Sequence, residues 1–121
     1  MGQQTGRMAA KRVLITGGAN GLGLAIAQRF SAEGARIAIC DINQEALDAV
    51  GRSHPEWLRL QCDVAQEPSV ALMFERLRAA LGGLDVLVNN AGIAGPTSPV
   101  EQIDPAAWQS VFNVNVFGTF L

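Results

Sequence analysis

The feature that most constrains the fold is a short apolar run followed by a glycine-rich turn and then a helix. Residues 13–15, Val-Leu-Ile, form a continuous apolar run, which is typical of a strand covered on both faces. The turn at residues 17–23, Gly-Gly-Ala-Asn-Gly-Leu-Gly, is rich in glycine and contains no charged residue. The helix after this turn is predicted from apolar residues four apart, Leu22, Ile26 and Phe30, and Gly34 suits its C-terminal cap.

The same alternation continues along the chain. Further strands are predicted at residues 37–40, 57–62 and 85–88, and helices at residues 44–51 and 69–81. Strands that alternate with helices at this spacing form right-handed crossover units, and therefore a parallel sheet. We predict an α/β fold with a doubly wound, Rossmann-like parallel sheet and helices on both of its faces. With about four strands, this sheet is incomplete.

Composition narrows the class of protein. The chain of 121 residues is 49% hydrophobic and 17% charged, which is typical of a globular domain. Its net charge of −2 argues against nucleic-acid binding, and no apolar run approaches the roughly 18 residues that a membrane helix needs. Cys40 and Cys62 are too few for a disulfide scaffold, so we expect buried, reduced thiols in a cytoplasmic protein. We expect no metal site.

The predicted domain begins after a short lead-in. Residues 1–11 are polar, small or basic and are expected to be flexible, whereas residues 12–121 are expected to form the N-terminal part of a single Rossmann-like domain. Residues 93–105 contain three prolines and are predicted to be a loop. The last segment, from Trp108 to Leu121, is ambiguous, because residues 114–116 alternate like a strand while its apolar residues also fit a helix.

The glycine-rich turn is the strongest chemical signal. Between a strand and a helix, such a turn allows backbone N–H groups to hold a diphosphate. Gly17 permits the tight turn, Gly21 allows the backbone to approach the phosphates, and Gly23 allows close packing of the helix. A nucleoside-triphosphate loop is excluded, because Leu24 and Ala25 stand where that loop needs Lys followed by Ser or Thr.

Four ordered motifs resemble the short-chain dehydrogenase/reductase family. They are Thr16-Gly17-Gly18-Ala19-Asn20-Gly21-Leu22-Gly23, Asp63-Val64, Asn89-Asn90-Ala91-Gly92 and Trp108 with Val114-Asn115-Val116-Phe117-Gly118. The resemblance extends from about Arg12 to Leu121. A methyltransferase or another nucleotide-binding α/β domain would require the second half of these motifs to be coincidental.

Asp41, at the end of the second predicted strand, favours NAD over NADP. A carboxylate there accepts hydrogen bonds from the ribose hydroxyls and repels a 2′-phosphate, and residues 17–23 contain no basic side chain. With the positions that the resemblance implies, including Asp63 and Val64 beside the adenine, the expected cofactor-binding residues are Gly17, Asn20, Gly21, Leu22, Gly23, Asp41, Ile42, Asp63, Val64, Asn90, Ala91 and Gly92.

The resemblance also implies the chemistry. Members of the family transfer a hydride between NAD(H) and an alcohol or carbonyl substrate, and Asn115 would be the catalytic asparagine that holds a proton-relay water within a kinked helix. The resemblance implies that the last segment is a helix. Because relatives form dimers or tetramers through this helix, we expect a homo-oligomer whose subunits contact each other through the helix around residues 106–121.

The family's catalytic tyrosine has no counterpart among these residues. The chain contains no tyrosine, and its only lysine, Lys11, precedes the first strand. The family's serine, tyrosine and lysine follow the catalytic asparagine, so we expect the chain to be the N-terminal part of a longer enzyme, inactive alone. We also expect the fourth strand to expose an apolar edge. The alternative is a non-enzymatic dinucleotide-binding or interaction module.

Overall fold

A computed structural model describes residues 6–121. The four strands and three helices that the sequence predicts before residue 90 recur in it with small shifts in their bounds. In chain order the elements are β1 (Arg12–Thr16), α1 (Gly21–Ala32), β2 (Arg36–Asp41), α2 (Gln44–Ser53), β3 (Leu58–Gln61), α3 (Glu67–Leu81), β4 (Val86–Val88), the 3₁₀ turn η1 (Val100–Gln102), α4 (Pro105–Phe112), the π-helical turn η2 (Asn113–Phe117) and α5 (Gly118–Phe120).

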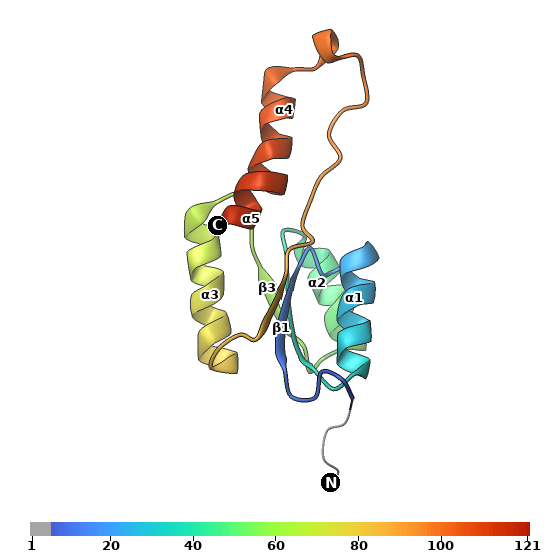
Figure 1. Cartoon of the computed structure of the whole chain (residues 1–121), viewed down its shortest axis with the longest axis vertical. Coiled ribbons are helices and arrows are strands. Elements are labelled where there is room, and N and C mark those ends of the chain that lie inside the picture. Colours follow the sequence, from blue (N-terminus) through green and yellow to red (C-terminus); the bar gives the residue numbers. More distant parts are fainter. Residues whose placement is uncertain (1–5) are drawn as a thin grey trace.

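The four strands form one parallel sheet in the order β3-β2-β1-β4, with β1 paired to β2 and β4. Helices α1 and α2 cover one face of this sheet and α3 covers the other (Figure 1). The predicted doubly wound, Rossmann-like fold is therefore confirmed. Because the strand order reverses direction at β1 and β4, a crevice is expected outside their carboxyl ends.

Alternate residues of the central strands build two cores. Val13 and Ile15 face α1 and α2, whereas Leu14 faces α3, and all three are fully buried. This explains why the three central residues of β1 are all apolar. Trp57, just before β3, belongs to the first of these cores, its indole N–H donates to the Ser31 hydroxyl at 3.4 Å, and its ring stacks on that of His54.

Two local predictions about helix ends agree with the structure. The Asn43 side chain accepts a hydrogen bond from the backbone N–H of Ala46 and caps α2. Gly34 follows the end of α1 with a φ of +92°, a conformation that glycine adopts readily. Leu22 differs from its predicted stripe, because it is 70% exposed rather than packed beneath α1.

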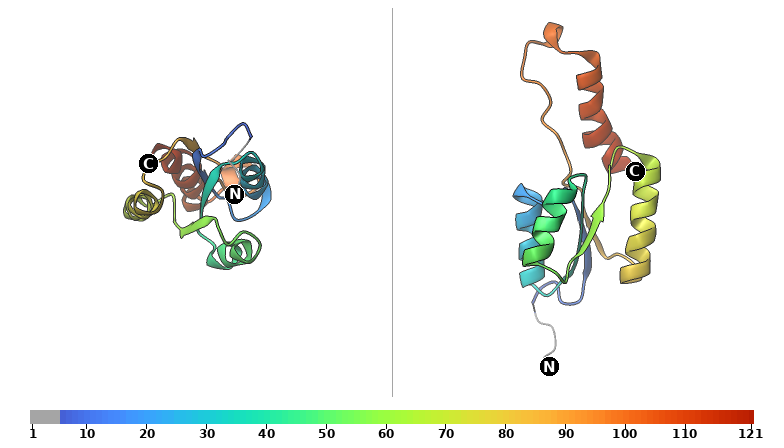
Figure 2. Two further views of the ribbon diagram at one scale, coloured as in Figure 1. Left: turned by 90° about the horizontal axis from the view of Figure 1, so that it is seen from below. Right: turned by 180° about the vertical axis from the view of Figure 1, so that it is seen from behind.

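The last segment is helical throughout, as the family resemblance implies. Helix α4 continues through η2 into α5, and together they project beyond the carboxyl end of the sheet (Figures 1 and 2). Within residues 6–121, β4 has a strand neighbour on one side only, and Leu87 on it is 43% exposed. The predicted apolar edge at β4 is thus present. No helix in this described part is long and apolar enough to cross a membrane.

Residues 1–5 of the expected lead-in lie outside the described residues, and its flexibility stays a prediction. The described part is hydrogen-bonded to the turn after α1, since the N–H groups of Met8 and Ala10 donate to the carbonyls of Glu33 and Gly34. Arg7 also contacts the Glu33 carboxylate, which lowers the pKa of Glu33.

Candidate cofactor-binding site

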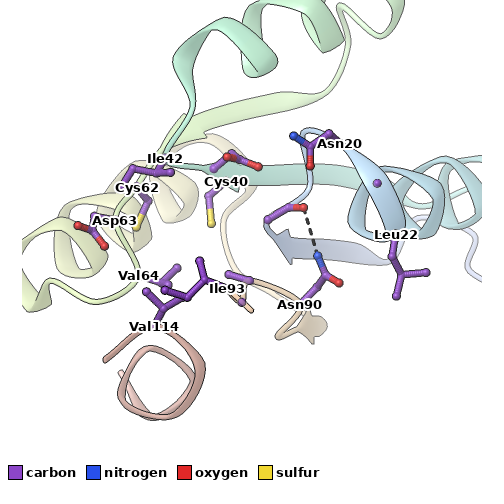
Figure 3. Close-up of a pocket in the computed structure, with 15 residues that line it drawn as sticks. Asn20, Leu22, Cys40, Ile42, Cys62, Asp63, Val64, Asn90, Ile93 and Val114 are labelled. Atoms are coloured by element: carbon purple, nitrogen blue, oxygen red, sulfur yellow. Dashed lines mark hydrogen bonds between the residues drawn. The ribbon is translucent and has the colours of Figure 1, made fainter. Parts of the chain in front are cut away.

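The carboxyl ends of the strands enclose a cavity of about 420 Å³ (Figure 3). It lies where the crevice of a doubly wound sheet is expected. Every residue predicted to bind the cofactor lines it except Gly23, and the residues that line it are Gly17, Asn20, Gly21, Leu22, Cys40, Asp41, Ile42, Cys62, Asp63, Val64, Asn90, Ala91, Gly92, Ile93 and Val114.

The first turn of α1 forms one wall of the cavity. The first N–H groups of a helix have no partner within the helix, and they carry its positive dipole end. At α1 no acidic residue stands in the first turn, and Asn20 at the cap makes no capping hydrogen bond through its side chain. The amides at the start of α1 can therefore hold an anion.

Gly21 and Gly23 serve different purposes in this wall. Gly21 has a φ of +56°, and a Cβ placed there would meet no atom within 4 Å, so the space above it is open. A Cβ at Gly23 would collide with the Gly17 carbonyl oxygen and the Asn90 side chain. Gly23 thus lies beneath the turn and allows its packing, as predicted, while Gly21 leaves room for a ligand.

Asp41 lies at the end of β2, across the glycine-rich turn. One carboxylate oxygen accepts a hydrogen bond from the backbone N–H of Ala19 at 3.2 Å, and the other accepts from that of Asn43 at 3.1 Å. These two bonds fix the carboxylate at the cavity wall. A carboxylate has further lone pairs, so Asp41 can still accept hydrogen bonds from a ligand's hydroxyl groups.

Thr16 and Asn90 join the ends of β1 and β4. The buried Thr16 hydroxyl oxygen accepts from the backbone N–H groups of Asn90 and Ala91, both at 3.0 Å. The Asn90 side-chain amide in turn donates to the carbonyls of Thr16 and Gly17, at 3.1 and 3.2 Å. Asn90 therefore shapes the turn as well as lining the cavity, and Thr16 is a site-forming residue absent from the predicted set.

Asn115 does not line the cavity, but it fixes the segment that does. Its side-chain oxygen accepts from the backbone N–H of Ile93 at 2.8 Å, and its side-chain amide donates to the Ile93 carbonyl at 2.9 Å. Asn115 stands within the π-helical turn η2, and such turns occur frequently at functional sites. Its backbone carbonyl accepts from the Thr119 hydroxyl at 3.4 Å.

The end of the cavity near β3 carries Asp63, Val64 and two thiols. The Asp63 carboxylate accepts from the backbone N–H of Ala65 at 3.0 Å, which orders the turn before α3. Cys40 and Cys62 lie beside each other here. Hydrogen bonds from the Cys40 thiol and the Ser69 hydroxyl lower the pKa of Cys62 to about 7, although burial opposes this shift. The pKa of Cys40 is raised by its contact with Cys62 and by burial.

The sequence analysis missed four residues that line the cavity: Cys40, Cys62, Ile93 and Val114. The two cysteines each immediately precede a predicted cofactor-binding aspartate, so their position at strand ends was a usable signal. Ile93 and Val114 come from a loop and a helix whose approach depends on the Asn115 side chain, and no periodicity reveals such a contact.

The chemistry of the lining suits a dinucleotide. Unpaired amides at α1 suit a diphosphate, the Asp41 carboxylate suits a diol, and the apolar side chains of Ile42 and Val64 suit a planar base. No three His, Cys, Asp or Glu side chains gather as metal ligands anywhere between residues 6 and 121.

Comparisons with known proteins agree with this geometry. The family model described as short chain dehydrogenase matches residues 11–121. The chain is 40% identical over 119 residues to the short chain dehydrogenase/reductase dpmpG of Macrophomina phaseolina, covering 94% of this chain and 68% of that protein. It is 38% identical to D-threitol dehydrogenase of Mycolicibacterium smegmatis, covering 95% of this chain and 45% of that protein.

Solved structures resemble the chain equally closely. The 3-ketoacyl-(acyl-carrier-protein) reductase of Brucella melitensis, complexed with NADH, superposes with a TM-score of 0.89 at 32% identity, over 93% of this chain and 47% of that one. An NAD⁺-bound xylitol dehydrogenase gives a TM-score of 0.89 at 33% identity, over 94% and 45%. The chain thus spans about half the length of these solved structures, and it belongs to the short-chain dehydrogenase family.

Proposed function

We propose that this chain is the NAD(H)-binding part of an oxidoreductase that transfers a hydride between NAD(H) and an alcohol or carbonyl substrate. The observation that carries the proposal is that one cavity has the free amides at the start of α1 on one wall and the fixed carboxylate of Asp41 on another. The relatives and the solved structures described above, two of them bound to NAD(H), support the same cofactor.

Each part of the cavity has a defined task in this proposal. The backbone N–H groups at Gly21 and Leu22 hold the diphosphate, while Asp41 accepts hydrogen bonds from the adenosine ribose and repels a 2′-phosphate. Ile42, Asp63 and Val64 bound the adenine. Bound NAD(H) supplies the hydride acceptor or donor.

The other half of the cavity would serve the nicotinamide side. Asn90, Ala91 and Gly92 form its wall at the end of β4. We assign Asn115 to the catalytic machinery because its side chain fixes Ile93, and because its backbone carbonyl lies in the π-helical turn, where it can hold a water molecule. Ile93 and Val114 add apolar side chains to this side of the cavity.

The proton step needs a group that these residues do not provide. The chain has no tyrosine, and Lys11 precedes β1, at the end of the sheet opposite the cavity. A positioned acid or base contributes roughly 10²–10⁴ in rate. We therefore propose that these 121 residues alone bind dinucleotide without measurable turnover, and the non-enzymatic binding module remains the second candidate.

Two further proposals follow from the surface and the thiols. Exposed aromatic and apolar side chains follow one another along α4, η2 and α5, so we propose that a second copy of the protein packs there; they are Trp108, Phe112, Val116, Phe117 and Phe120. Both cysteines of the chain are free and buried, which supports a reducing compartment such as the cytoplasm.

A cofactor titration tests the proposal. We expect the purified protein to bind NADH at least about tenfold more tightly than NADPH, because the Asp41 carboxylate repels the additional phosphate. In Asp41→Asn we expect the two affinities to become similar. Asp48→Asn is the matched control: it removes the same charge from α2, outside the cavity, and should leave the preference unchanged.

Fluorescence titration with each coenzyme gives both dissociation constants. Binding of neither coenzyme to the folded protein would contradict the proposed function. If Asp41→Asn keeps the preference for NADH over NADPH, the role of Asp41 is refuted, but the proposed function is not.

A further inference from the structure

Two thiols meet at the end of the cavity, and the proposed function uses neither. Cys40 is the penultimate residue of β2, and Cys62 directly follows β3, which pairs with β2 in parallel. Both residues line the cavity, and Figure 3 shows both sulfur atoms pointing from the strand ends towards Val64 and Ile93.

The two thiols differ in their surroundings. Cys40 is fully buried, whereas Cys62 keeps 3% of its surface exposed, at the cavity. The Ser69 hydroxyl, from the first turns of α3, donates to the Cys62 sulfur at 3.6 Å. Both thiols line the cavity, and only Cys62 keeps any exposed surface, so Cys62 is the better placed of the two to react with a small molecule there.

Hydrogen bonding also favours the thiolate of Cys62. The Cys40 thiol lowers the pKa of Cys62 to about 7, burial opposes this, Ser69 lowers it further and the Asp63 carboxylate raises it. The pKa of Cys40 is raised by Cys62, by burial and by Asp41. Hydrogen bonding thus favours the nucleophilic thiolate at Cys62 and the protonated thiol at Cys40.

We propose that Cys62 is a modification site, where small neutral disulfides form a mixed disulfide inside the cavity. The Cys62 sulfur attacks one sulfur of the disulfide; a new S–S bond forms, the original S–S bond breaks, and the other half leaves as a thiolate. Cys62 is oxidised and the departing half is reduced. An added thiol reverses the exchange by the same step.

The attached group would occupy the part of the cavity bounded by Ile42, Asp63 and Val64. That part is where the adenine would lie, so modification and NAD(H) binding exclude each other. This second half of the inference rests on the proposed function, whereas the exchange at Cys62 does not. Cys62 would then couple the redox state of the surroundings to cofactor binding.

Tryptic peptides separate the two thiols, because Cys40 falls within residues 37–52 and Cys62 within residues 60–76. The purified protein is treated with 2-hydroxyethyl disulfide, quenched in acid and mapped by mass spectrometry without reduction. We expect the adduct on the peptide 60–76, with a rate that rises with pH through a midpoint below that of an ordinary thiol, and little adduct on the peptide 37–52. Saturating NADH should slow the reaction at least tenfold.

Two variants connect this result to the geometry. Ser69→Ala removes a hydrogen bond to the Cys62 sulfur, so the midpoint of the pH profile should rise; Ser53→Ala, at the end of α2 and outside the cavity, is the matched control and should leave the midpoint unchanged. Circular dichroism verifies that both variants are folded.

The outcomes separate the two halves of the inference. A faster reaction on the peptide 37–52, or an adduct only after denaturation, would overturn the modification site. If NADH binds but does not protect Cys62, mutual exclusion is wrong and the proposed function stands. If the adduct forms but no NADH binds, the proposed function fails and the modification site stands.

Discussion

The two ends of the parallel sheet differ in how their polar groups are paired. At the amino end, Arg12 donates from its backbone and guanidinium to the Asp85 carboxylate, at 2.9 and 3.0 Å, and this closes the gap between β1 and β4. At the carboxyl end, the first amides of α1 face a cavity. One end is satisfied by the protein itself, whereas the other has donors available for a ligand.

This difference follows from the topology. In a strand–helix–strand unit, each helix begins near the carboxyl end of the preceding strand, so helix N-termini gather at that end of the sheet. Helix C-termini gather at the other end, where Gly34 and Gly82 follow α1 and α3 in the left-handed conformation. Substitutions at the two ends should therefore separate binding from stability.

A valine at Gly21 should give the largest effect. Gly21 has a φ of +56° and open space above it, so Gly21→Val places a branched side chain where the diphosphate would approach. We expect NADH affinity to fall by about 100-fold or more. Backbone strain should also destabilise the fold by about 1–2 kcal/mol. Titration calorimetry and urea denaturation measure the two effects.

Gly82→Val is the matched control at the opposite end of the sheet. Gly82 also has a positive φ, of +78°, and the nearest atom to its Cβ position is Arg12 Nη1 at 3.9 Å. The same strain should cost a similar free energy of unfolding, while the NADH affinity of the folded protein should stay unchanged. Equal losses of affinity in both variants would mean that Gly21→Val acts through folding alone.

Thr16→Val should have the next largest effect, and it identifies the part of the carboxyl end that is structural. Valine has nearly the same shape as threonine but cannot accept the hydrogen bonds from the N–H groups of Asn90 and Ala91. The Asn90 N–H keeps its bond to the Val88 carbonyl at 3.1 Å, so the partly buried N–H of Ala91 is the donor left without this partner, and the loss should destabilise the protein by about 1 kcal/mol. Thr119→Val, whose hydroxyl contacts only the Asn115 carbonyl of its own helix, is the control and should cost less.

The denaturation midpoints of these two variants give the comparison. If Thr16→Val is no less stable than Thr119→Val, then water replaces the lost hydroxyl, and the connection between β1 and β4 is weaker than its short distances indicate.

The sequence predicts most of the fold because its signals are local. The buried runs in β1 and β2, the Asn43 cap and the glycine after α1 all act within a few residues, and each lies where it is expected. Leu22 is the exception. Its spacing places it on the apolar stripe of α1, but the helix begins at Gly21, so the first turn extends past the sheet and Leu22 faces the cavity.

The candidate site was predictable where it depends on strand ends. Residues such as Asp41 and Asn90 follow strands whose carboxyl ends meet, so their convergence follows from topology. The contributions of Thr16, Ile93 and Val114 were not predictable, because they depend on contacts between segments far apart in the chain, such as Asn115 with Ile93. The helical form of the last segment came from the family resemblance, since its apolar periodicity fits a strand and a helix alike.

Asp85→Asn should have the smallest effect, and it tests the amino end directly. Hydrogen bonds from Arg12 lower the pKa of Asp85 to about 2, below its ordinary 3.8. A carboxylate with a lowered pKa in the folded protein adds stability that is complete above pH 3.8 and is lost as the pH falls towards 2. Asn cannot ionise, so the variant should be slightly less stable at neutral pH and should lose less stability over this window.

The pair is partly exposed to solvent, which keeps its contribution small and sensitive to salt. Urea denaturation of both proteins at pH 7, 4 and 3 measures the difference, and Asp48→Asn again supplies a control with the same loss of charge on α2. NADH affinity at pH 7 should be the same in Asp85→Asn and in the unmodified protein, because the whole sheet separates this ion pair from the cavity. A loss of affinity would show that the amino-end contact between β1 and β4 sets the width of the crevice at their carboxyl ends, so that the two ends are coupled through the strands.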